Sequence, residues 1–306
     1  MILSCGEALI DMLPRTTTLG EAGFAPYAGG AVFNTAIALG RLGAPSGFFS
    51  GLSTDMLGEI LADTLRASNV DITPCARSGR PTTVAFVKLM NGQATYAFYD
   101  EATAGRMLAL GDLPALPPAV QALFFGGISL VNDPAASTYE ALQAREAASR
   151  VTMIDPNIRP GFITDAAGYR ARIGRMMACA DIVKLSDEDL AWLMGPGHIT
   201  DLARKIIATG PKIVLVTEGA KGAHAITGKG ALWQAARAVA VADTVGAGDT
   251  FNAGVLASLH AAGMLHKAAL QSLPDAVLQA ALALGNRAAA ITVSRAGANP
   301  PWAHEL

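Results

Sequence analysis

An α/β fold, with a mostly parallel sheet covered by helices on both faces, is predicted for this chain of 306 residues. Short apolar runs of strand length recur without polar alternation, as expected of strands that are buried on both faces. Ala-rich stretches long enough for crossover helices lie between these runs. The clearest apolar runs are residues 123–130, 151–155, 182–185 and 213–217, and two of the intervening helices are expected at 135–150 and 201–209.

The composition is typical of a compact protein with a large core. Hydrophobic residues make up 51% of the chain and charged residues 16%, which is far from a disordered composition. Lys and Arg total 23 and Asp and Glu total 25, without blocks of like charge, so we expect neither a nucleic acid nor a membrane as partner. The richest apolar stretch, 276–293, is interrupted by Gln279, Asn286 and Arg287, so no membrane span is expected.

The N-terminal stretch and the cysteines favour a cytoplasmic location. No basic region precedes the first apolar stretch, and Glu7 and Asp11 interrupt it, so we interpret it as a first strand rather than a signal peptide. Cys5, Cys75 and Cys179 are far apart and have no C-x-x-C spacing. This pattern fits reduced thiols and predicts neither a disulfide framework nor a zinc site.

A β-hairpin is predicted where the alternation of strands and helices is broken. Residues 82–90 and 93–99 flank Asn91-Gly92, and Asn-Gly between two β-prone runs is a strong hairpin signal. A two-residue turn would place Tyr96 and Phe98 on one largely apolar face, and the opposite face is also apolar. We therefore expect one face to cover a ligand pocket and the other to pack on the core or on a second subunit. An edge hairpin of the main sheet is the alternative.

The stretch 243–254 carries the strongest chemical signal. Gly246 and Gly248 allow a tight turn with exposed backbone N–H groups before a buried helix, and such a turn binds a phosphate without a basic side chain. Asp249 would repel a resting phosphate, so its reasonable use is as a general base that takes a proton from a hydroxyl. A simple Asp N-cap after a glycine turn is the structural alternative.

Two weaker signals near the N-terminus indicate a polyol site. Gly29-Gly30 permits close approach to the backbone, and the amide of Asn34 offers both a donor and an acceptor to sugar hydroxyls. Asp11 ends the first strand, where ligands of open α/β sheets bind. A buried, satisfied amide at Asn34 and a turn cap at Asp11 are the alternatives. P-loop and dinucleotide-binding fingerprints are missing from the sequence, which argues against a P-loop nucleotide-binding protein and a dehydrogenase.

These motifs resemble a known family. Residues 243–254 look like the C-terminal signature of the ribokinase-like (pfkB) carbohydrate kinases, and residues 29–34 resemble their N-terminal signature. Residues 6–11 match the first-strand pattern, the hairpin matches the lid, and residues 294–298 match the closing segment. The resemblance covers nearly the whole chain in the right order.

Membership would imply a ribokinase-like three-layer α/β/α core with a mostly parallel sheet and a small β-sheet lid. The whole chain, 1–306, would form one catalytic domain, with a lid built from about 12–27 and 82–103. The apolar outer face of the hairpin leads us to expect a homodimer formed through the lid.

Together with the arguments from the residues, the resemblance assigns roles to individual positions. Asp249 is the catalytic base, and the backbone of Gly246, Ala247 and Gly248 is the anion hole. The expected sugar contacts are Asp11, Gly29, Gly30, Asn34, Tyr96, Phe98, Asp100 and Arg159, and the expected ATP contacts are Ser186, Thr217, Gly219, Gly222, Gly248 and Asn286.

The resemblance also implies metal ions beside ATP. Ser186-Asp187-Glu188-Asp189 stands in place of the family's N-x-x-E segment, in a form similar to fructokinase-type members. Asp189 can still hold a water molecule of Mg²⁺. A monovalent-cation site, suited to K⁺, is expected at Asp243, the carbonyl of Val245, and the backbone near Thr292, Arg295 and Gly297.

The implied activity is ATP-dependent transfer of a phosphoryl group to a primary hydroxyl. We expect a neutral ketohexose, most simply D-fructose, because no basic residue lies between Gly29 and Asn34 and the lid ends in Tyr99-Asp100-Glu101. These carboxylates would repel a sugar acid, which basic side chains usually bind. Arg159 and Arg106 leave 2-keto-3-deoxygluconate open as the substrate, and ribose or a nucleoside such as adenosine are further alternatives. A sugar-binding regulator without activity is the alternative from another class.

Overall fold

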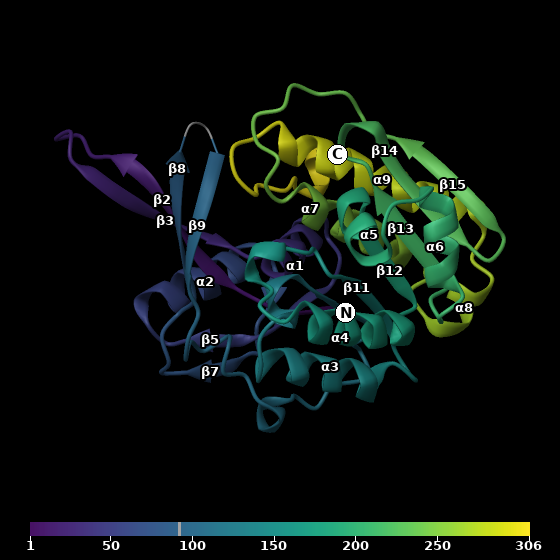
Figure 1. The fold of residues 1–306 in the computed structure, drawn as a ribbon, viewed down its shortest axis with the longest axis horizontal. Helices are drawn as coiled ribbons and strands as arrows, with labels where there is room; N and C mark the ends of the chain where they lie inside the picture. Colours follow the sequence, from purple (N-terminus) through teal and green to yellow (C-terminus); the bar gives the residue numbers. More distant parts are fainter. Residues whose placement is uncertain (91–92) are drawn as a thin grey trace.

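The computed structural model describes residues 1–90 and 93–306, with the side chains of 88–96 outside that description. Its main sheet is parallel except at one edge, where β13, β14 and β15 run antiparallel. The nine strands follow in the spatial order β15 (Gly230–Ala235), β14 (Gly222–Thr227), β13 (Ile213–Thr217), β12 (Ile182–Ser186), β11 (Val151–Asp155), β10 (Ala122–Gly126), β1 (Ile2–Cys5), β4 (Ser46–Phe49) and β6 (Val70–Asp71) (Figure 1).

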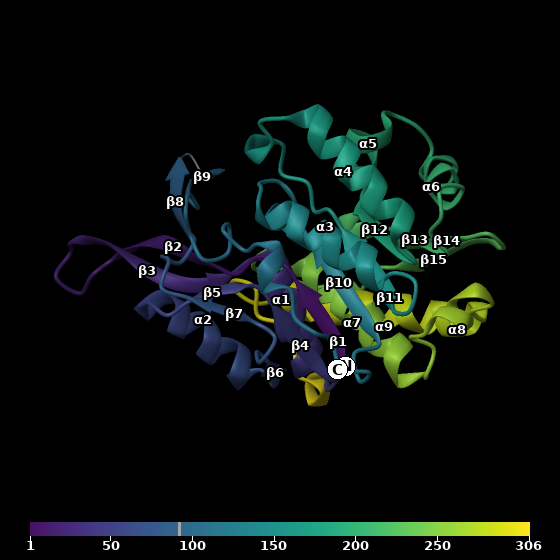
Figure 2. The ribbon, with the colours of Figure 1, turned by 90° about the horizontal axis from the view of Figure 1, so that it is seen from below.

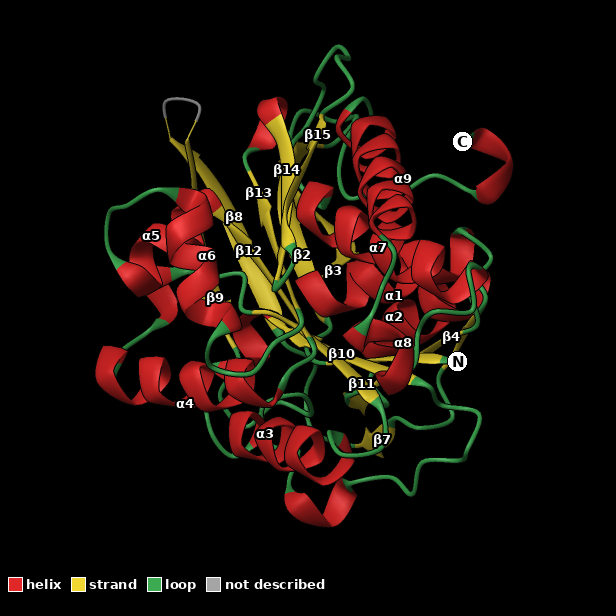
Figure 3. Cartoon of the chain, turned by 90° about the vertical axis from the view of Figure 1, so that its right-hand side faces the viewer, coloured by secondary structure: helices red, strands yellow, loops and turns green. Residues whose placement is uncertain are grey.

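Helices cover both faces of this sheet, so the predicted three-layer core is confirmed (Figure 3). One layer contains α1 (Ala31–Arg41), α2 (Met56–Ala67), α7 (Ala247–Ala261), α8 (Lys267–Gln271) and α9 (Asp275–Val293), and the other contains α3 (Ala135–Glu146), α4 (Ala166–Cys179), α5 (Asp187–Met194) and α6 (Ile199–Ile207).

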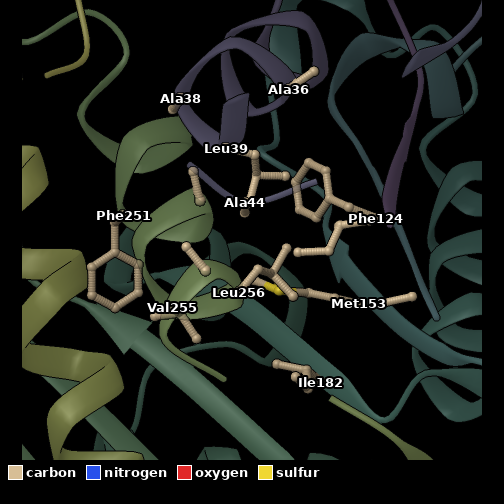
Figure 4. Packing of buried hydrophobic residues seen from close by; sticks show 14 of the residues in the cluster. Ala36, Ala38, Leu39, Ala44, Phe124, Met153, Ile182, Phe251, Val255 and Leu256 are labelled. Carbon is tan, nitrogen blue, oxygen red and sulfur yellow. The ribbon is translucent and has the colours of Figure 1, made fainter. Parts of the chain in front are cut away.

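Two hydrophobic cores lie on the two sides of the sheet. Alternate residues of each strand point to opposite faces, so Phe124 and Met153 pack with α1 and α7, while their neighbours Phe125 and Ile154 pack with α3 and α4. Figure 4 shows the first of these cores around Phe124, Met153 and Leu256. Burial on both faces is the physical reason that the strands are continuous apolar runs in the sequence.

Most predicted core elements agree with the structure, but the strand expected at 123–130 is too long. It ends at Gly126, and Gly127–Leu130 forms a 3₁₀ helix, η2. Gly127 has φ of 67°, a left-handed conformation that breaks the strand. A Cβ at this position would also lie 2.1 Å from Oε1 of Glu7. The turn therefore depends on a contact with the end of β1, which a local apolar pattern does not reveal.

A separate sheet of four strands projects from the main body (Figures 1 and 2). The hairpin pairs Val87 with Tyr96 and Ala85 with Phe98, as predicted, while its turn at Asn91-Gly92 lies outside the described residues. Because β8 pairs with β2 and not with the main sheet, the edge-hairpin alternative is wrong. The sheet has the order β3 (Ala22–Gly29), β2 (Leu9–Thr16), β8 (Val84–Met90) and β9 (Gln93–Tyr99), and β5 (Gly51–Ser53) and β7 (Ala76–Ser78) form a further small pair.

Among the described residues, α9 has the length and hydropathy that a membrane span requires. It packs on α7 and against β14 and β15, and 44% of its apolar window is buried. A helix in the core of a protein meets the same criteria, so this finding is weak evidence for a membrane span.

Candidate active site

A cavity of about 640 Å³ opens at the carboxyl edge of the main sheet. Its lining follows the segment after β1 and the carboxyl ends of β10, β11, β12 and β13, and β1 is the strand from which successive connections leave in opposite directions, to β4 on one side and β10 on the other. Its lining brings together residues from the whole length of the chain. The predicted site residues among them are Asp11, Gly30, Asn34, Phe98, Arg159, Ser186, Asp189, Thr217, Gly219, Gly222, Val245, Gly246, Ala247, Gly248, Asp249 and Asn286.

The glycine turn before α7 is the predicted anion site, with the backbone of Gly246, Ala247 and Gly248 as its expected donors. The N–H of Ala247 is already engaged, because it donates to the carbonyl of Thr244 over 3.4 Å. Gly246 is the N-cap of α7 and has φ of 78°, and a Cβ on it would lie 2.8 Å from the Cβ of Ala298. Glycine is therefore needed both for the conformation and for the close packing. The amide groups of Gly248 and Asp249 belong to the first helical turn, where the helix itself supplies no acceptor. They are available to hold a phosphoryl group.

Asp249 is buried at the same helix terminus, only 6% exposed. Burial raises the pKa of its carboxyl group to about 7, helped by the nearby carboxylate of Asp155 and opposed by a hydrogen bond from Asn34 and by the charge of Lys184. The Nδ2 of Asn34 donates to Oδ2 of Asp249 over 2.9 Å. A carboxyl group with a pKa near neutrality is well matched to general-base chemistry.

The predicted sugar contacts on β2, β3 and α1 converge opposite Asp249. Asp11 does not end the first strand, in contrast to the prediction, because β1 ends at Cys5 and Asp11 lies within β2 of the lid sheet. It still lines the cavity, and burial raises the pKa of its carboxyl group to about 6. Gly30 begins α1 with φ of 114°, and a side chain there would meet the backbone of Glu7 at 2.9 Å. Gly29 is not among the lining residues: a Cβ on it would lie 2.5 Å from Oδ2 of Asp11. Its role is to leave room for that carboxylate.

The lid reaches the cavity through Phe98. The Phe98 ring lies edge-on to the ring of Phe162, with centroids 4.2 Å apart, and both residues line the cavity. Phe162 belongs to the short 3₁₀ helix Pro160–Phe162, which follows β11 of the main sheet. The side chain of Tyr96, the other predicted lid contact, lies outside the described residues.

Asp100 does not line the cavity, in contrast to its predicted sugar contact. Its Oδ2 accepts a hydrogen bond of 2.9 Å from Nη1 of Arg106, and Asn132 approaches the same oxygen at 3.4 Å. The charges of Asp100 and Arg106 therefore compensate each other outside the cavity, at the base of the lid. Arg159 does line the cavity, and its Nη1 donates to the carbonyl of Ile158.

The residues predicted to contact ATP line the other part of the cavity, at the carboxyl ends of β12 and β13, at the starts of β14 and α7, and within α9. Gly222 has φ of 138°, and a Cβ on it would lie 2.2 Å from the carbonyl oxygen of Gln234. Asn286 donates from Nδ2 to the carbonyls of Gln234 and Ala235, at 2.9 and 3.1 Å. These bonds hold α9 against β15 and leave the amide oxygen of Asn286 to face a ligand.

Asp189 lines this part of the cavity, where it is buried and fixed by two backbone donors. Its Oδ1 accepts from the N–H of Ile158 at 3.0 Å, and its Oδ2 accepts from the N–H of Ser186 at 3.4 Å. Each carboxylate oxygen keeps a lone pair for a water molecule of a metal ion. Among the described residues no group of three or more His, Cys, Asp or Glu side chains forms a metal cage. This donor set suits Mg²⁺, which keeps most of its waters and binds substrate phosphates.

The residues predicted for a monovalent cation also come together, below the anion site. Oδ1 of Asp243 accepts from the N–H of Val245 at 3.0 Å, and Oδ2 accepts from the N–H of Gly297 at 2.9 Å. Asp243 thus joins the loop before α7 to the segment after α9. Thr292 contacts Thr250 through its hydroxyl group, and Arg295 forms an ion pair with Glu305, so only their backbones remain available to a cation.

Sequence reasoning missed Glu7, a buried carboxylate that lines the cavity. Its Oε1 accepts from the N–H groups of Ala31 and Val32 at the start of α1, and its Oε2 accepts from the N–H of Ser129 in η2. Glu7 therefore ties β1, α1 and η2 together beneath the sugar contacts. A charged residue that directly follows a buried strand was the available signal.

The fold and the cavity define a class of protein. A ribokinase-like core with a lid, an amide anion site and a buried carboxylate between the two halves of one cavity is the arrangement of a sugar kinase. Comparison with known proteins identifies the family: the chain belongs to the pfkB family of carbohydrate kinases, which it matches over residues 1–305.

Individual relatives agree with this assignment. The chain is 60% identical to a fructokinase of Rhizobium leguminosarum bv. trifolii over 279 residues, 91% of this chain and 86% of the relative. The structure is similar to that of fructokinase with bound ATP from Xylella fastidiosa, with a TM-score of 0.88 and 27% identity over 97% of this chain and 93% of the other. A fructokinase double mutant from Vibrio cholerae with bound fructose, ADP and potassium has a TM-score of 0.85 at 27% identity, over the same shares of the two chains.

Proposed function

We propose that this enzyme transfers the γ-phosphoryl group of ATP to a primary hydroxyl of D-fructose. One observation carries the proposal: Asp249 lies buried between the amide anion site of α7 and the cavity end where Asp11, Gly30 and Asn34 meet. A carboxylate in that position faces both the acceptor hydroxyl and the phosphoryl group. The 60% identity to a fructokinase supports fructose as the acceptor.

In the proposed mechanism, Asp249 accepts the proton of the sugar hydroxyl as its oxygen attacks the γ-phosphorus. Asn34 holds the carboxylate by donating to Oδ2, which leaves Oδ1 to face the acceptor. The amides of Gly248 and Asp249 bind the oxygens of the transferring group, where charge is spread in the transition state. Mg²⁺, when bound, would neutralise phosphate charge, with Asp189 holding one of its waters. K⁺ would occupy the backbone site around Asp243.

The charges around the sugar contacts support a neutral sugar. Asp11 is the acidic residue among the predicted sugar contacts that line the cavity. Arg106, which could have bound a sugar acid, is already paired with Asp100. An acid sugar would face repulsion from Asp11, and Arg159 is the one basic residue among the predicted sugar contacts that could compensate it, since Lys184, also in the lining, is paired with Asp155. Arg159 is the specific feature that favours 2-keto-3-deoxygluconate as the second candidate.

An assay of ADP release with a panel of sugars tests the proposal. We expect kcat/KM for fructose to exceed that for ribose, 2-keto-3-deoxygluconate and adenosine, and NMR of the product to show phosphate on a primary carbon. A tenfold preference for any of the other three acceptors would contradict fructose as the substrate. Absence of ADP release with every acceptor would favour a sugar-binding regulator.

We further infer that the enzyme works in the cytoplasm as a homodimer through the outer face of the lid. Phe24 and Tyr99 are 51% and 62% exposed and both contact the ring of Phe86 edge-on, so an aromatic patch lies open on the sheet. Sedimentation should give a dimer for the parent and a monomer for Phe24→Ser/Tyr99→Ser. A parent that sediments as a monomer at micromolar concentration would contradict the dimer.

A further inference from the structure

A buried lysine lies beneath the anion site. Lys184 belongs to β12, between apolar residues of the core, and its side chain is only 5% exposed. Burying an ammonium group in such a strand is costly unless a partner compensates the charge. Its position therefore needs an explanation that packing alone does not supply.

Asp155, at the carboxyl end of β11, is the partner. Nζ of Lys184 lies 2.9 Å from Oδ2 of Asp155, whose side chain is 1% exposed. Nδ2 of Asn252, on α7, donates to the same oxygen over 2.7 Å. Three elements thus meet at one carboxylate, and the ammonium is held in a defined place.

This pairing uses only part of the hydrogen-bonding capacity of the lysine. An ammonium group has three N–H donors, and Asp155 is the one partner that the side chain of Lys184 has in the described part of the chain. Nζ also lies only 3.1 Å from the place that a Cβ on Gly248 would occupy. The remaining donors are therefore next to the amide groups that bind the phosphoryl group.

The charge of the cavity calls for a cation at this place. A triphosphate adds negative charge to a lining that is already acidic, and each uncompensated charge in a partly buried site is costly. The acidic side chains that line the cavity outnumber the basic ones. The acidic residues are Glu7, Asp11, Asp187, Glu188, Asp189 and Asp249, and the basic residues are Arg159 and Lys184.

We propose that Lys184 is a further catalytic residue, whose ammonium group binds the oxygens of the transferring phosphoryl group beside Gly248 while Asp155 holds it in place. The bond between the γ-phosphorus and the bridging oxygen breaks, and its electron pair leaves with ADP. The new bond forms to the sugar oxygen, whose proton goes to Asp249. Lys184 keeps its proton throughout and stabilises the charge that spreads over the phosphoryl oxygens.

The same contact explains why residue 248 is glycine. Its backbone conformation is helical and does not itself require glycine. A methyl group at this position would stand against Nζ of Lys184. Glycine keeps the path between the ammonium and the phosphoryl group open.

The test separates this role from simple compensation of the Asp155 charge. Lys184→Met leaves a buried carboxylate without its cation, so we expect both lower thermal stability and lower turnover. The double variant Lys184→Met/Asp155→Asn removes both charges, and the amide oxygen introduced at position 155 can still accept from Asn252. We expect the double variant to regain most of the melting temperature of the parent, while kcat stays about 10²–10³-fold lower, the usual effect of losing one donor to a developing anion. Asp155→Asn alone is the matched control.

Recovery of kcat to within tenfold of the parent in the double variant would overturn the proposal, because Lys184 would then serve only to neutralise Asp155. If Lys184→Met alone fails to fold, the kcat of the double variant still shows whether Lys184 contributes to catalysis. The inference rests on the proposed function, but the two can fail separately. The activity of the parent with fructose tests the acceptor, whereas the ratio of variant to parent, measured with the best acceptor of the panel, tests Lys184.

Discussion

The amide nitrogen of Asn34 donates a hydrogen bond of 2.9 Å to Oδ2 of Asp249, although the two residues are 215 positions apart in the chain. This bond joins the first turn of α1 to the first turn of α7. It places the predicted sugar-binding amide directly on the predicted base. The orientation and ionisation of Asp249 are therefore coupled to the helix that carries the sugar contacts.

Asn34→Ala should move the acid limb of the profile of kcat/KM against pH to higher pH. The hydrogen bond from Asn34 lowers the pKa of Asp249, so its loss leaves the carboxyl group protonated to a higher pH. We also expect a higher KM for fructose. Thr35→Val is the matched control, because the Thr35 hydroxyl contacts the backbone oxygen of Asp249 and not the carboxylate. An unchanged acid limb in Asn34→Ala would contradict this coupling.

For the parent enzyme, activity should fall as pH decreases through about 7. Asp249 must be ionised to accept a proton, and burial raises its pKa to about 7. Asp11, whose pKa is raised to about 6, should add a second loss of fructose binding at lower pH. Initial rates at subsaturating fructose between pH 5 and 9 measure both losses, the one assigned to Asp249 and the one assigned to Asp11. A profile that is flat down to pH 5 would remove Asp249 from the role of base.

Replacing the base should reduce turnover without loss of the fold. Asn and Asp are nearly isosteric, so Asp249→Asn keeps the packing at the start of α7 and can still accept from Asn34. We expect kcat to decrease about 10²–10⁴-fold, the usual contribution of a positioned general base. Steady-state kinetics and circular dichroism measure the two parts of this prediction. Turnover within a few-fold of the parent would be incompatible with the mechanism.

The same substitution should stabilise the protein at high pH. The folded-state pKa of Asp249, about 7, lies above its value of 3.8 in the unfolded chain. The folded state therefore binds more protons between these values, and stability decreases as pH rises through this window. Asp249→Asn removes that cost, on the order of 2–4 kcal/mol at pH 8 and little at pH 4. Melting temperatures at the two pH values provide the test, and equal shifts at both would contradict it.

Phe98→Ala should weaken fructose saturation more than ATP saturation. Phe98 and Phe162 both line the cavity and their rings are in edge-on contact, so the loss of the Phe98 ring should admit water to the site of transfer. We expect KM for fructose to rise several-fold more than KM for ATP. Leu19→Ala, in the exposed connection between β2 and β3 of the same lid sheet, is the control. Equal effects on both substrates would indicate general destabilisation instead.

The predictions that agree best with the structure rest on local physics. β11 and β13 have the bounds that their apolar runs indicated, because strands covered on both faces exclude polar residues. The turn at Gly246 could be predicted from the sequence, because a residue in the left-handed conformation before a helix is usually glycine. The register of the hairpin strands agrees with the one predicted for a two-residue turn at Asn91-Gly92.

Other features depend on contacts between distant segments. Asp100 carries the charge of a ligand-binding residue, but Arg106 and Asn132 engage it outside the cavity. Lys184 lies in a run that looks like an ordinary strand, and only its approach to Gly248 and Asp155 points to the chemical role that we propose for it.

By itself, the sequence determined the α/β class, the positions of several core strands and helices, and the chemical character of the turn before α7, since these follow from periodicity and from the conformational limits of glycine. The tertiary structure decided which side chains meet: Asn34 with Asp249, Lys184 with Asp155, and Glu7 with the start of α1. Such pairs depend on how helices and strands pack across the sheet. The pKa of a buried carboxyl group depends on the same packing, because it is set by the loss of water and by charges brought from elsewhere in the chain.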